Sequence, residues 1–216
     1  MKILVINPGS TSTKIAVYEN DTPRLVRNIR HTVDELSSFS HIIDQFEFRK
    51  NLVLKELEAD NIPFEFDAIV GRGGLLKPIP GGVYEVNDAM LDDILHAMRT
   101  HACNLGCLIA SELAALLPGC RAFIADPGVV DELDEIARIT GSPLMPRITI
   151  WHALNQRAIA RRYAAAQHVR YEDLDLIVCH LGGGISVGVH HHGKAVDVNN
   201  ALDGEGPFSP ERAGTL

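Results

Sequence analysis

The chain has 216 residues, of which 46% are hydrophobic, 22% charged and 6% aromatic, a composition typical of a globular protein with one large or two small cores. The formal net charge of −8 excludes a general nucleic-acid-binding protein, which needs a basic surface to displace counterions from phosphates. The apolar run at the N-terminus is too short for a signal peptide, and no stretch approaches the length of a membrane span. We therefore expect a cytoplasmic protein that has neither nucleic acid nor membrane as a partner.

The first part of the chain predicts a mixed sheet. An apolar run over 2–6 ends in a Pro-Gly turn, and the alternation over 13–18 predicts that the chain returns as an antiparallel strand. A third strand is expected over 24–31, and apolar residues at helical spacing predict a helix over 41–59. The other elements expected before residue 150 are strands over 67–71 and 121–125 and helices over 88–98 and 104–117.

The opening pattern recurs after residue 150. A helix is expected over 151–166, followed by a strand over 175–179, a glycine-rich turn, a strand over 185–189 and a strand over 195–198. Because both halves open as strand, glycine-bearing turn, strand, turn, strand, the sequence indicates two related domains. We expect a complete domain over 1–150 and, over 151–216, a linker helix with the incomplete start of a second domain, so that the chain is a fragment.

The turn after the first strand is rich in hydrogen-bond donors. It reads Asn7-Pro-Gly-Ser-Thr-Ser-Thr-Lys14 and offers backbone N–H groups, four hydroxyls and one ammonium group, which suits a phosphate. The spacing is not that of a Walker loop. A polar hairpin turn without a ligand would also satisfy Pro-Gly-Ser, so this segment alone leaves both interpretations open. The candidate phosphate-binding residues are Asn7, Gly9, Ser10, Thr11, Ser12 and Lys14.

The corresponding turn of the second half reads His180-Leu-Gly-Gly-Gly-Ile-Ser186. Glycine weakens a sheet unless another group approaches its backbone, so three consecutive glycines after a strand favour a ligand here. Two such turns facing each other across a cleft would hold the two ends of a triphosphate. The candidates in this turn are His180, Gly182, Gly183, Gly184 and Ser186.

Two further segments carry candidate polar groups. Arg72 is followed by Gly73 and Gly74, and a guanidinium fixed between glycines can grip a carboxylate or phosphate, although a solvent-facing arginine in a loop fits equally well. The apolar residues over 75–83 would line a pocket for a short alkyl chain or simply pack the loop. Asp126 ends a strand and precedes a proline, where it would help place Mg²⁺ or form an Asx-turn.

Two single residues complete the candidate set. His152 opens a helix, where it would donate to a phosphoryl group or cap the helix, and Arg212 lies in a polar loop, where it would stabilise a phosphoryl group. Two clusters are expected to have no such role. The histidines at 190–192 predict a solvated hairpin turn, and the acidic run over 131–135 predicts an exposed helix start.

Together these segments resemble the acetate and butyrate kinase family, within the sugar kinase, Hsp70 and actin superfamily. Residues 7–14 look like its first phosphate motif and residues 180–186 like its second, while Asp126, His152 and Arg212 stand at the places of its active-site Asp, His and Arg. The resemblance spans the whole chain. It implies an α/β fold of the ribonuclease H-like (actin-like ATPase) type, with a mixed sheet flanked by helices.

The resemblance implies a reversible kinase reaction. ATP and a short fatty acid would give an acyl phosphate and ADP by direct in-line phosphoryl transfer, with Mg²⁺ and without a covalent enzyme intermediate. Pro8 and the segments over 71–74 and 204–212 are closer to the butyrate type than to the acetate type, which favours butyrate. The alternatives are an acetate, propionate or branched-chain acid kinase, or a non-catalytic nucleotide-binding switch module of the same fold.

The resemblance also implies a role for each candidate. Arg72 would hold the carboxylate, Arg212 and His152 would stabilise the equatorial phosphoryl oxygens, and Asn7 and Asp126 would help place the metal. The first domain would be the acyl-substrate and phosphate lobe, and the second would be the nucleotide-binding lobe, whose adenine-binding residues are not expected within this chain. The fragment alone would have little activity, and the full-length protein is expected to form a homodimer or a higher homo-oligomer.

Overall fold

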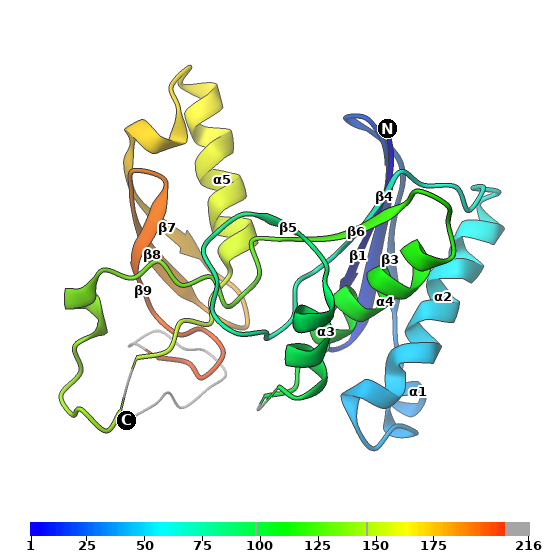
Figure 1. Ribbon diagram of the computed structural model, residues 1–216, viewed down its shortest axis with the longest axis horizontal. Coiled ribbons are helices and arrows are strands. Elements are labelled where there is room, and N and C mark those ends of the chain that lie inside the picture. The colour runs from blue at the N-terminus through cyan, green and yellow to red at the C-terminus, as the bar shows by residue number, and fades with distance from the viewer. Residues whose placement is uncertain (98, 146, 206–216) are drawn as a thin grey trace. The chain divides into compact units, whose positions relative to one another are not determined.

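The computed structural model describes residues 1–97, 99–145 and 147–205, and their contacts form two compact units (Figure 1). The first unit comprises residues 1–77 and 83–125, and the second comprises residues 78–82 together with the chain from Asp126 onward. The domain boundary expected at residue 150 lies inside the second unit. Residues just after Asp126 pair with that unit, since Val130 forms a bridge with Ile79 and the Asp134 N–H donates to the Val196 carbonyl.

The first unit is built on a six-stranded mixed sheet in the order β3-β2-β1-β4-β6-β5. β1 pairs in parallel with β4, and β4 with β6, whereas β2, β3 and β5 join antiparallel to their neighbours. All five strands expected in this unit are confirmed, and only the three-residue β5 was not predicted. The strands are β1 (Lys2–Pro8), β2 (Ser12–Glu19), β3 (Thr22–Arg30), β4 (Ala68–Gly71), β5 (Val83–Glu85) and β6 (Arg121–Ala125).

Helices of the first unit are α1 (Val33–Ser37), α2 (Phe46–Ala59), α3 (Asp88–Leu95) and α4 (Asn104–Ala115), with a short 3-10 helix η1 (Ile42–Gln45) before α2. The helix expected over 41–59 therefore begins later, after the 3-10 turn. α1 was not predicted, although Thr32 and Glu35 form the reciprocal capping box that begins it. Within the described part of the chain, no helix combines the length and apolar character that crossing a bilayer requires.

The core of the first unit lies between one face of the sheet and helices α2 and α4. Alternate residues of β1, Leu4 and Ile6, are fully buried, and Val53 and Leu57 of α2 lie one helical turn apart on the buried side. Helix α4 approaches β4 through two glycines. A Cβ atom added at Gly71 would lie 2.1 Å from the Gly106 carbonyl oxygen, so only a residue without a side chain fits there.

The second unit contains a three-stranded antiparallel sheet in the order β7-β8-β9 and one long helix. As in the first unit, a strand, a turn and two antiparallel strands follow one another, which confirms the recurring pattern. Its apolar core includes Val130, Trp151 and Val198. The elements are η2 (Glu135–Arg138), α5 (Ala153–Ala166), η3 (Tyr171–Asp173), β7 (Asp175–His180), β8 (Ser186–His191) and β9 (Lys194–Val198).

The glycine contact between β4 and α4 gives a first prediction. Gly71→Ala must push the backbone of α4 away from the sheet and is expected to lower the free energy of unfolding by about 3 kcal/mol, measured by urea denaturation. Gly141→Ala is the matched control, because nothing lies within 4 Å of a Cβ atom at that position. Equal stability of the two variants would contradict the packing argument.

Candidate functional site

Three polar side chains of the first unit converge on one side of its sheet. β1 and β4 are parallel, with Ile6 opposite Gly71, so Asn7 and Arg72 follow at the same carboxyl edge. The Arg72 Nη1 atom lies 3.4 Å from the Asn7 Oδ1 atom. Lys14 is the cross-strand partner of Asn7, and directly opposed residues share a face of the sheet. Two cations and a carboxamide at one edge make a site suited to an anion.

The turn between β1 and β2 is held from behind by the side chain of Arg49. This guanidinium is 0% exposed and comes from α2. Its Nη1 atom donates to the carbonyl oxygens of Gly9, at 2.9 Å, and Ser12, at 3.2 Å. Its Nε and Nη2 atoms donate to the Gln45 side chain at 3.0 and 2.8 Å, and no carboxylate contacts it among the described residues.

The remaining carbonyls of this turn are also engaged. The Ser10 carbonyl lies 3.5 Å from Arg49 Nη2, and the Thr11 carbonyl accepts from the His31 N–H at 2.9 Å. Because a trans peptide directs its C=O and N–H in opposite directions, the N–H groups of Ser10 and Thr11 point away from Arg49. Both residues are exposed. An incoming anion therefore meets hydrogen-bond donors at this turn, while the carbonyl oxygens are already paired within the protein.

A buried threonine and histidine extend this support. Thr13 is 0% exposed, accepts from Arg49 Nη1 at 3.0 Å and lies 2.9 Å from the His31 Nε2 atom. Burial, and after it the charge of Arg49, lower the pKa of His31, so the imidazole stays neutral beside the guanidinium. Arg49, Thr13 and His31 were not among the residues predicted from the sequence.

The glycines after Arg72 serve packing against the start of α4. Gly73 and Gly74 are buried, and a Cβ atom at Gly74 would lie 2.8 Å from the Asn104 Cα atom. The Leu75 N–H donates to the Asn104 Oδ1 atom at 3.0 Å. These contacts and those of Gly71 hold the backbone on both sides of Arg72 in place. The half-buried Arg72 side chain therefore extends from a fixed backbone.

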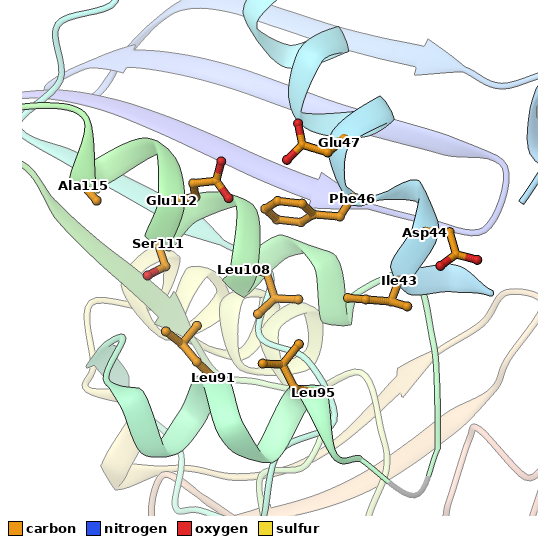
Figure 2. Close-up of a pocket in the computed structure, with 10 residues that line it drawn as sticks. All are labelled: Ile43, Asp44, Phe46, Glu47, Leu91, Leu95, Leu108, Ser111, Glu112 and Ala115. Carbon is orange, nitrogen blue, oxygen red and sulfur yellow. The ribbon is translucent and has the colours of Figure 1, made fainter.

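A largely apolar cavity of about 530 Å³ lies among α2, α3 and α4 of the first unit (Figure 2). Its lining carries the carboxylates of Asp44, Glu47 and Glu112. Lys50 pairs with the Glu47 and Glu112 carboxylates, and none of the predicted site residues lines the cavity. The alkyl pocket expected over 75–83 is therefore not this cavity. Its apolar lining residues are Ile43, Phe46, Leu91, Leu95, Leu108 and Ala115.

In the second unit, the glycine-rich turn brings three predicted residues together. His180 and Ser186 are the last paired residues of β7 and β8, on either side of the turn. The Ser186 Oγ atom lies 2.9 Å from the His152 Nδ1 atom, and the rings of His152 and His180 stack with centroids 3.6 Å apart. Gly182 and Gly183 are exposed at the tip of the turn.

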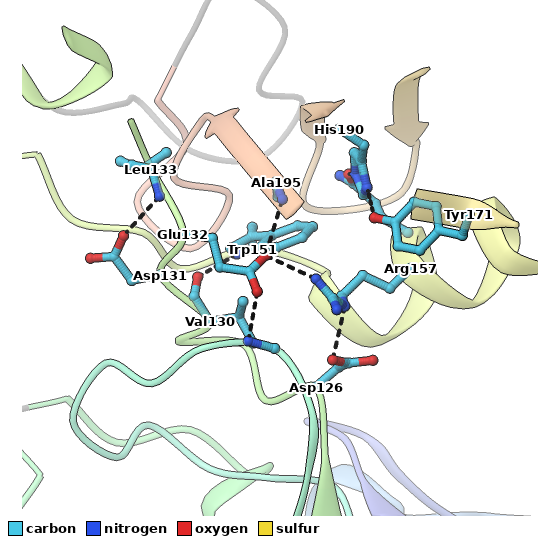
Figure 3. Close-up of polar contacts among 12 residues, drawn as sticks. Asp126, Val130, Asp131, Glu132, Leu133, Trp151, Arg157, Tyr171, His190 and Ala195 are labelled. Atoms are coloured by element: carbon cyan, nitrogen blue, oxygen red, sulfur yellow. Dashed lines mark hydrogen bonds and ion pairs between the residues drawn. The ribbon is translucent and has the colours of Figure 1, made fainter. Parts of the chain in front are cut away.

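Asp126 is buried at the end of β6 with a left-handed backbone, φ 36°. Its carboxylate lies 2.9 Å from Arg157 Nε (Figure 3) and 3.0 Å from Arg161 Nη1. Both oxygens therefore face arginines of α5 within the same unit. The Oδ1 atom accepts no hydrogen bond within the described residues, so a role of Asp126 in placing Mg²⁺ stays a prediction.

Glu132 is a largely buried residue that the sequence did not single out. Its carboxylate accepts from the backbone N–H groups of Gly81 at 2.9 Å and Ala195 at 3.1 Å and pairs with Arg157 at 2.9 Å (Figure 3). The acidic run over 131–135 was predicted as an exposed helix start. That prediction is wrong for Glu132, because the 3-10 helix begins only at Glu135 and the Glu132 side chain is 9% exposed.

The burial of His190 also contradicts a prediction from the sequence. The histidines at 190–192 were predicted to form a solvated turn, but His190 is 0% exposed, whereas His191 and His192 are exposed. Its Nδ1 atom lies 2.5 Å from the Tyr171 Oη atom, and its Nε2 atom lies 2.9 Å from the Gln156 Oε1 atom. Burial lowers the pKa of His190 to about 4.

The predicted residues thus form one group in each unit. Residues 7–14 and Arg72 belong to the first unit, while Asp126, His152 and residues 180–186 belong to the second. Arg212, predicted as a catalytic arginine, lies outside the described residues.

Proteins of similar sequence carry the name that the motifs predicted. No family model matches the chain. The chain is 79% identical over all 216 residues to a protein named "Probable butyrate kinase" from Bacteroides thetaiotaomicron, and 55% identical over 217 aligned residues to "Butyrate kinase 2" from Clostridium acetobutylicum. It spans 61% of the length of each of these relatives. The resemblance predicted from the sequence is thereby confirmed, since the whole chain is similar to proteins with these names.

Solved structures confirm the predicted fold class. The acetate kinase of Porphyromonas gingivalis matches all of this chain and 61% of its own, with a TM-score of 0.67 at 20% identity. A propionate kinase from Francisella tularensis matches 93% of this chain and 57% of its own, with a TM-score of 0.62 at 16% identity. At these identities the likeness shows the mixed α/β fold of that group and nothing about the substrate.

The paired carbonyls of the first turn give a second prediction. Arg49→Met keeps the volume of the side chain but leaves buried acceptors without donors, so the free energy of unfolding should fall by roughly 3 kcal/mol in urea denaturation. The amide proton of Gly9, which is bonded to the Ser12 carbonyl within the turn, should also exchange faster. Exposed Arg30→Met is the control and should stay within about 0.5 kcal/mol of the parent. A stable Arg49→Met protein would show that the guanidinium is dispensable.

The buried imidazole gives a third prediction. Because the pKa of His190 is about 4 in the folded state and 6.5 ordinarily, only the unfolded chain takes up this proton as the pH falls between those values. The free energy of unfolding should therefore decrease on acidification, by up to about 1.4 kcal/mol per pH unit for one proton. Fluorescence of Trp151, the single tryptophan, would follow urea unfolding at several pH values. His190→Gln should reduce this slope and exposed His192→Gln should not.

Proposed function

Because the chain is a homologue of butyrate kinases along its whole length, we propose that the intact protein transfers a phosphoryl group reversibly between ATP and a short-chain carboxylate, with butyrate favoured. The observation that carries the proposal is the turn over 9–12, whose carbonyls are all paired within the protein and whose Ser10 and Thr11 N–H groups point away from Arg49. Lys14 and Arg72 add positive charge beside it. This turn is built to receive an anion, and the proposed place of action is the cytoplasm.

Each group of residues has a proposed task. The Ser10 and Thr11 N–H groups, the hydroxyls over 10–12 and Lys14 hold phosphate oxygens, and the glycine turn over 182–184 holds nucleotide phosphates. Arg72 grips the carboxylate of the acid. His152 and Arg212 stabilise the transferring phosphoryl group. Phosphoryl transfer needs mainly positioning and neutralisation of charge, so such a set is sufficient in kind without a covalent nucleophile.

Mg²⁺ accompanies ATP in the proposed reaction and would neutralise charge on the phosphates, which themselves supply several of its ligands. The Asn7 carboxamide oxygen suits a hard cation of this kind. Asp126 would add a carboxylate oxygen, because its Oδ1 atom accepts no hydrogen bond within the described residues. We propose that Asp126 also holds Arg157 and Arg161 in place.

The wider assignments follow from the same proposal. The first unit serves as the acyl-substrate and phosphate lobe, the second carries part of the nucleotide-binding lobe, and the intact protein assembles as a homodimer or larger homo-oligomer. Acetate, propionate and branched-chain acids are the alternative substrates. A non-catalytic nucleotide switch of the same fold would have no need of Arg72 beside the phosphate turn.

The fourth prediction tests this function directly. The intact protein with ATP and Mg²⁺ should form acyl phosphate, trapped as a hydroxamate, from butyrate in preference to acetate, propionate and isobutyrate. Arg72→Lys keeps the charge but loses the two-pronged grip, so the KM for the acid should rise by about tenfold or more, with a smaller change in the KM for ATP.

Exposed Arg24→Lys is the matched control and should leave both constants unchanged. Absence of hydroxamate with every acid would exclude the acyl kinase, and an unchanged KM in Arg72→Lys would remove that residue from the carboxylate site.

A further inference from the structure

A line of hydrogen-bonded polar side chains in the second unit ends at His152. Its members are Tyr171, His190, Gln156, Ser186 and His152. The Tyr171 Oη atom lies 2.5 Å from His190 Nδ1 (Figure 3), and His190 Nε2 lies 2.9 Å from Gln156 Oε1. Gln156 Nε2 lies 2.8 Å from Ser186 Oγ, which is 2.9 Å from His152 Nδ1. Gln156, Ser186 and His190 are each 0% exposed, so water does not compete for these contacts.

The backbone carbonyl of Ser186 sets the direction of the first bonds. Gln156 Nε2 also lies 2.9 Å from this carbonyl oxygen, which can only accept a hydrogen bond. The amide nitrogen must therefore face Ser186, and the amide oxygen must face His190. His190 then donates from Nε2, its Nδ1 atom accepts, and Tyr171 donates its hydroxyl proton. The lowered pKa of His190 agrees with this neutral form.

The direction of these hydrogen bonds also determines which atom donates between Ser186 and His152. Its oxygen accepts from Gln156 Nε2 and lies 3.4 Å from the His152 backbone N–H, which is also a donor. Among the described contacts of this hydroxyl, His152 Nδ1 is the one atom able to accept its proton. The Nδ1 atom therefore carries no proton, and the proton of the neutral ring lies on Nε2.

The geometry points to Gln156 as a positioning residue: we infer that, through Ser186, it holds His152 as the neutral tautomer with the proton on Nε2, while Tyr171 and His190 hold Gln156. The part of this inference that concerns catalysis rests on the proposed function. A ring fixed in this tautomer presents a hydrogen-bond donor at Nε2, which is the form that can bind a phosphoryl oxygen. Stacking on His180 at an interplanar angle of 8° fixes the plane of the ring.

Gly188 of β8 leaves the space that this arrangement needs. A Cβ atom at Gly188 would lie 2.4 Å from Gln156 Oε1 and 3.0 Å from His190 Nε2. A methyl group there would displace the amide while leaving every polar group of the line in the chain. Gly188→Ala is therefore a second way to break the line, independent of replacing Gln156.

The test is the fifth prediction and needs no substrate. In the intact protein labelled with ¹⁵N-histidine, long-range proton–nitrogen NMR at neutral pH should show His152 with an unprotonated Nδ1 and a protonated Nε2. Gln156→Leu and Gly188→Ala should each convert His152 to a mixture of tautomers and lower kcat on the order of a hundredfold. Exposed Gln167→Leu, just beyond the same helix, is the control and should change neither.

The outcomes separate this inference from the proposed function. A wild-type His152 protonated at Nδ1, or an unchanged tautomer in both variants, overturns the inference even if the acyl kinase activity is present. The predicted tautomer in a protein without acyl kinase activity supports the hydrogen-bond line and rejects the function. If Gln156→Leu fails to fold, the wild-type spectrum and Gly188→Ala decide.

Discussion

The architecture of the first unit depends on one buried cation, the guanidinium of Arg49. A charge removed from water is costly unless its hydrogen bonds are met, and here main-chain carbonyls and the Gln45 amide meet them instead of a carboxylate. The carbonyls of the turn after β1 must therefore face inward. This orientation turns the amide groups of Ser10 and Thr11 outward, so the stability of the helix–sheet contact and the polarity of the turn have a common cause.

The second unit buries charge by the opposite means. Arg157 is 7% exposed and lies between the carboxylates of Asp126 and Glu132, so acid and base compensate each other directly. Glu132 also accepts main-chain N–H groups from Gly81 and from Ala195, in the segment over 78–82 and in β9. Three separate stretches of the chain are thus tied together by one ionic cluster, which explains why residues 78–82 group with the second unit.

The sequence predicted the strands and both glycine turns, because short apolar runs and Pro-Gly or Gly-Gly-Gly segments report local preferences of the backbone. It did not reveal Arg49, Glu132 or His190. Arg49 fits the charged face of an amphipathic helix, Glu132 stands in an acidic run and His190 in a run of three histidines. Their burial is decided by partners far along the chain, such as Gly9 for Arg49 and Ala195 for Glu132, and periodicity carries no record of such partners.

The left-handed backbone of Asp126 sets two physical demands against each other at a single position. A φ of 36° is a strained conformation for a residue with a side chain, with a cost on the order of 1 kcal/mol or more, and glycine would relieve it. Glycine would also remove the carboxylate that pairs with Arg161 and leave Arg157 with Glu132 alone. Over evolutionary time the backbone therefore favours drift to glycine while the neighbouring charges oppose it, and asparagine would be the compromise that gives up the charge but keeps a hydrogen-bond acceptor.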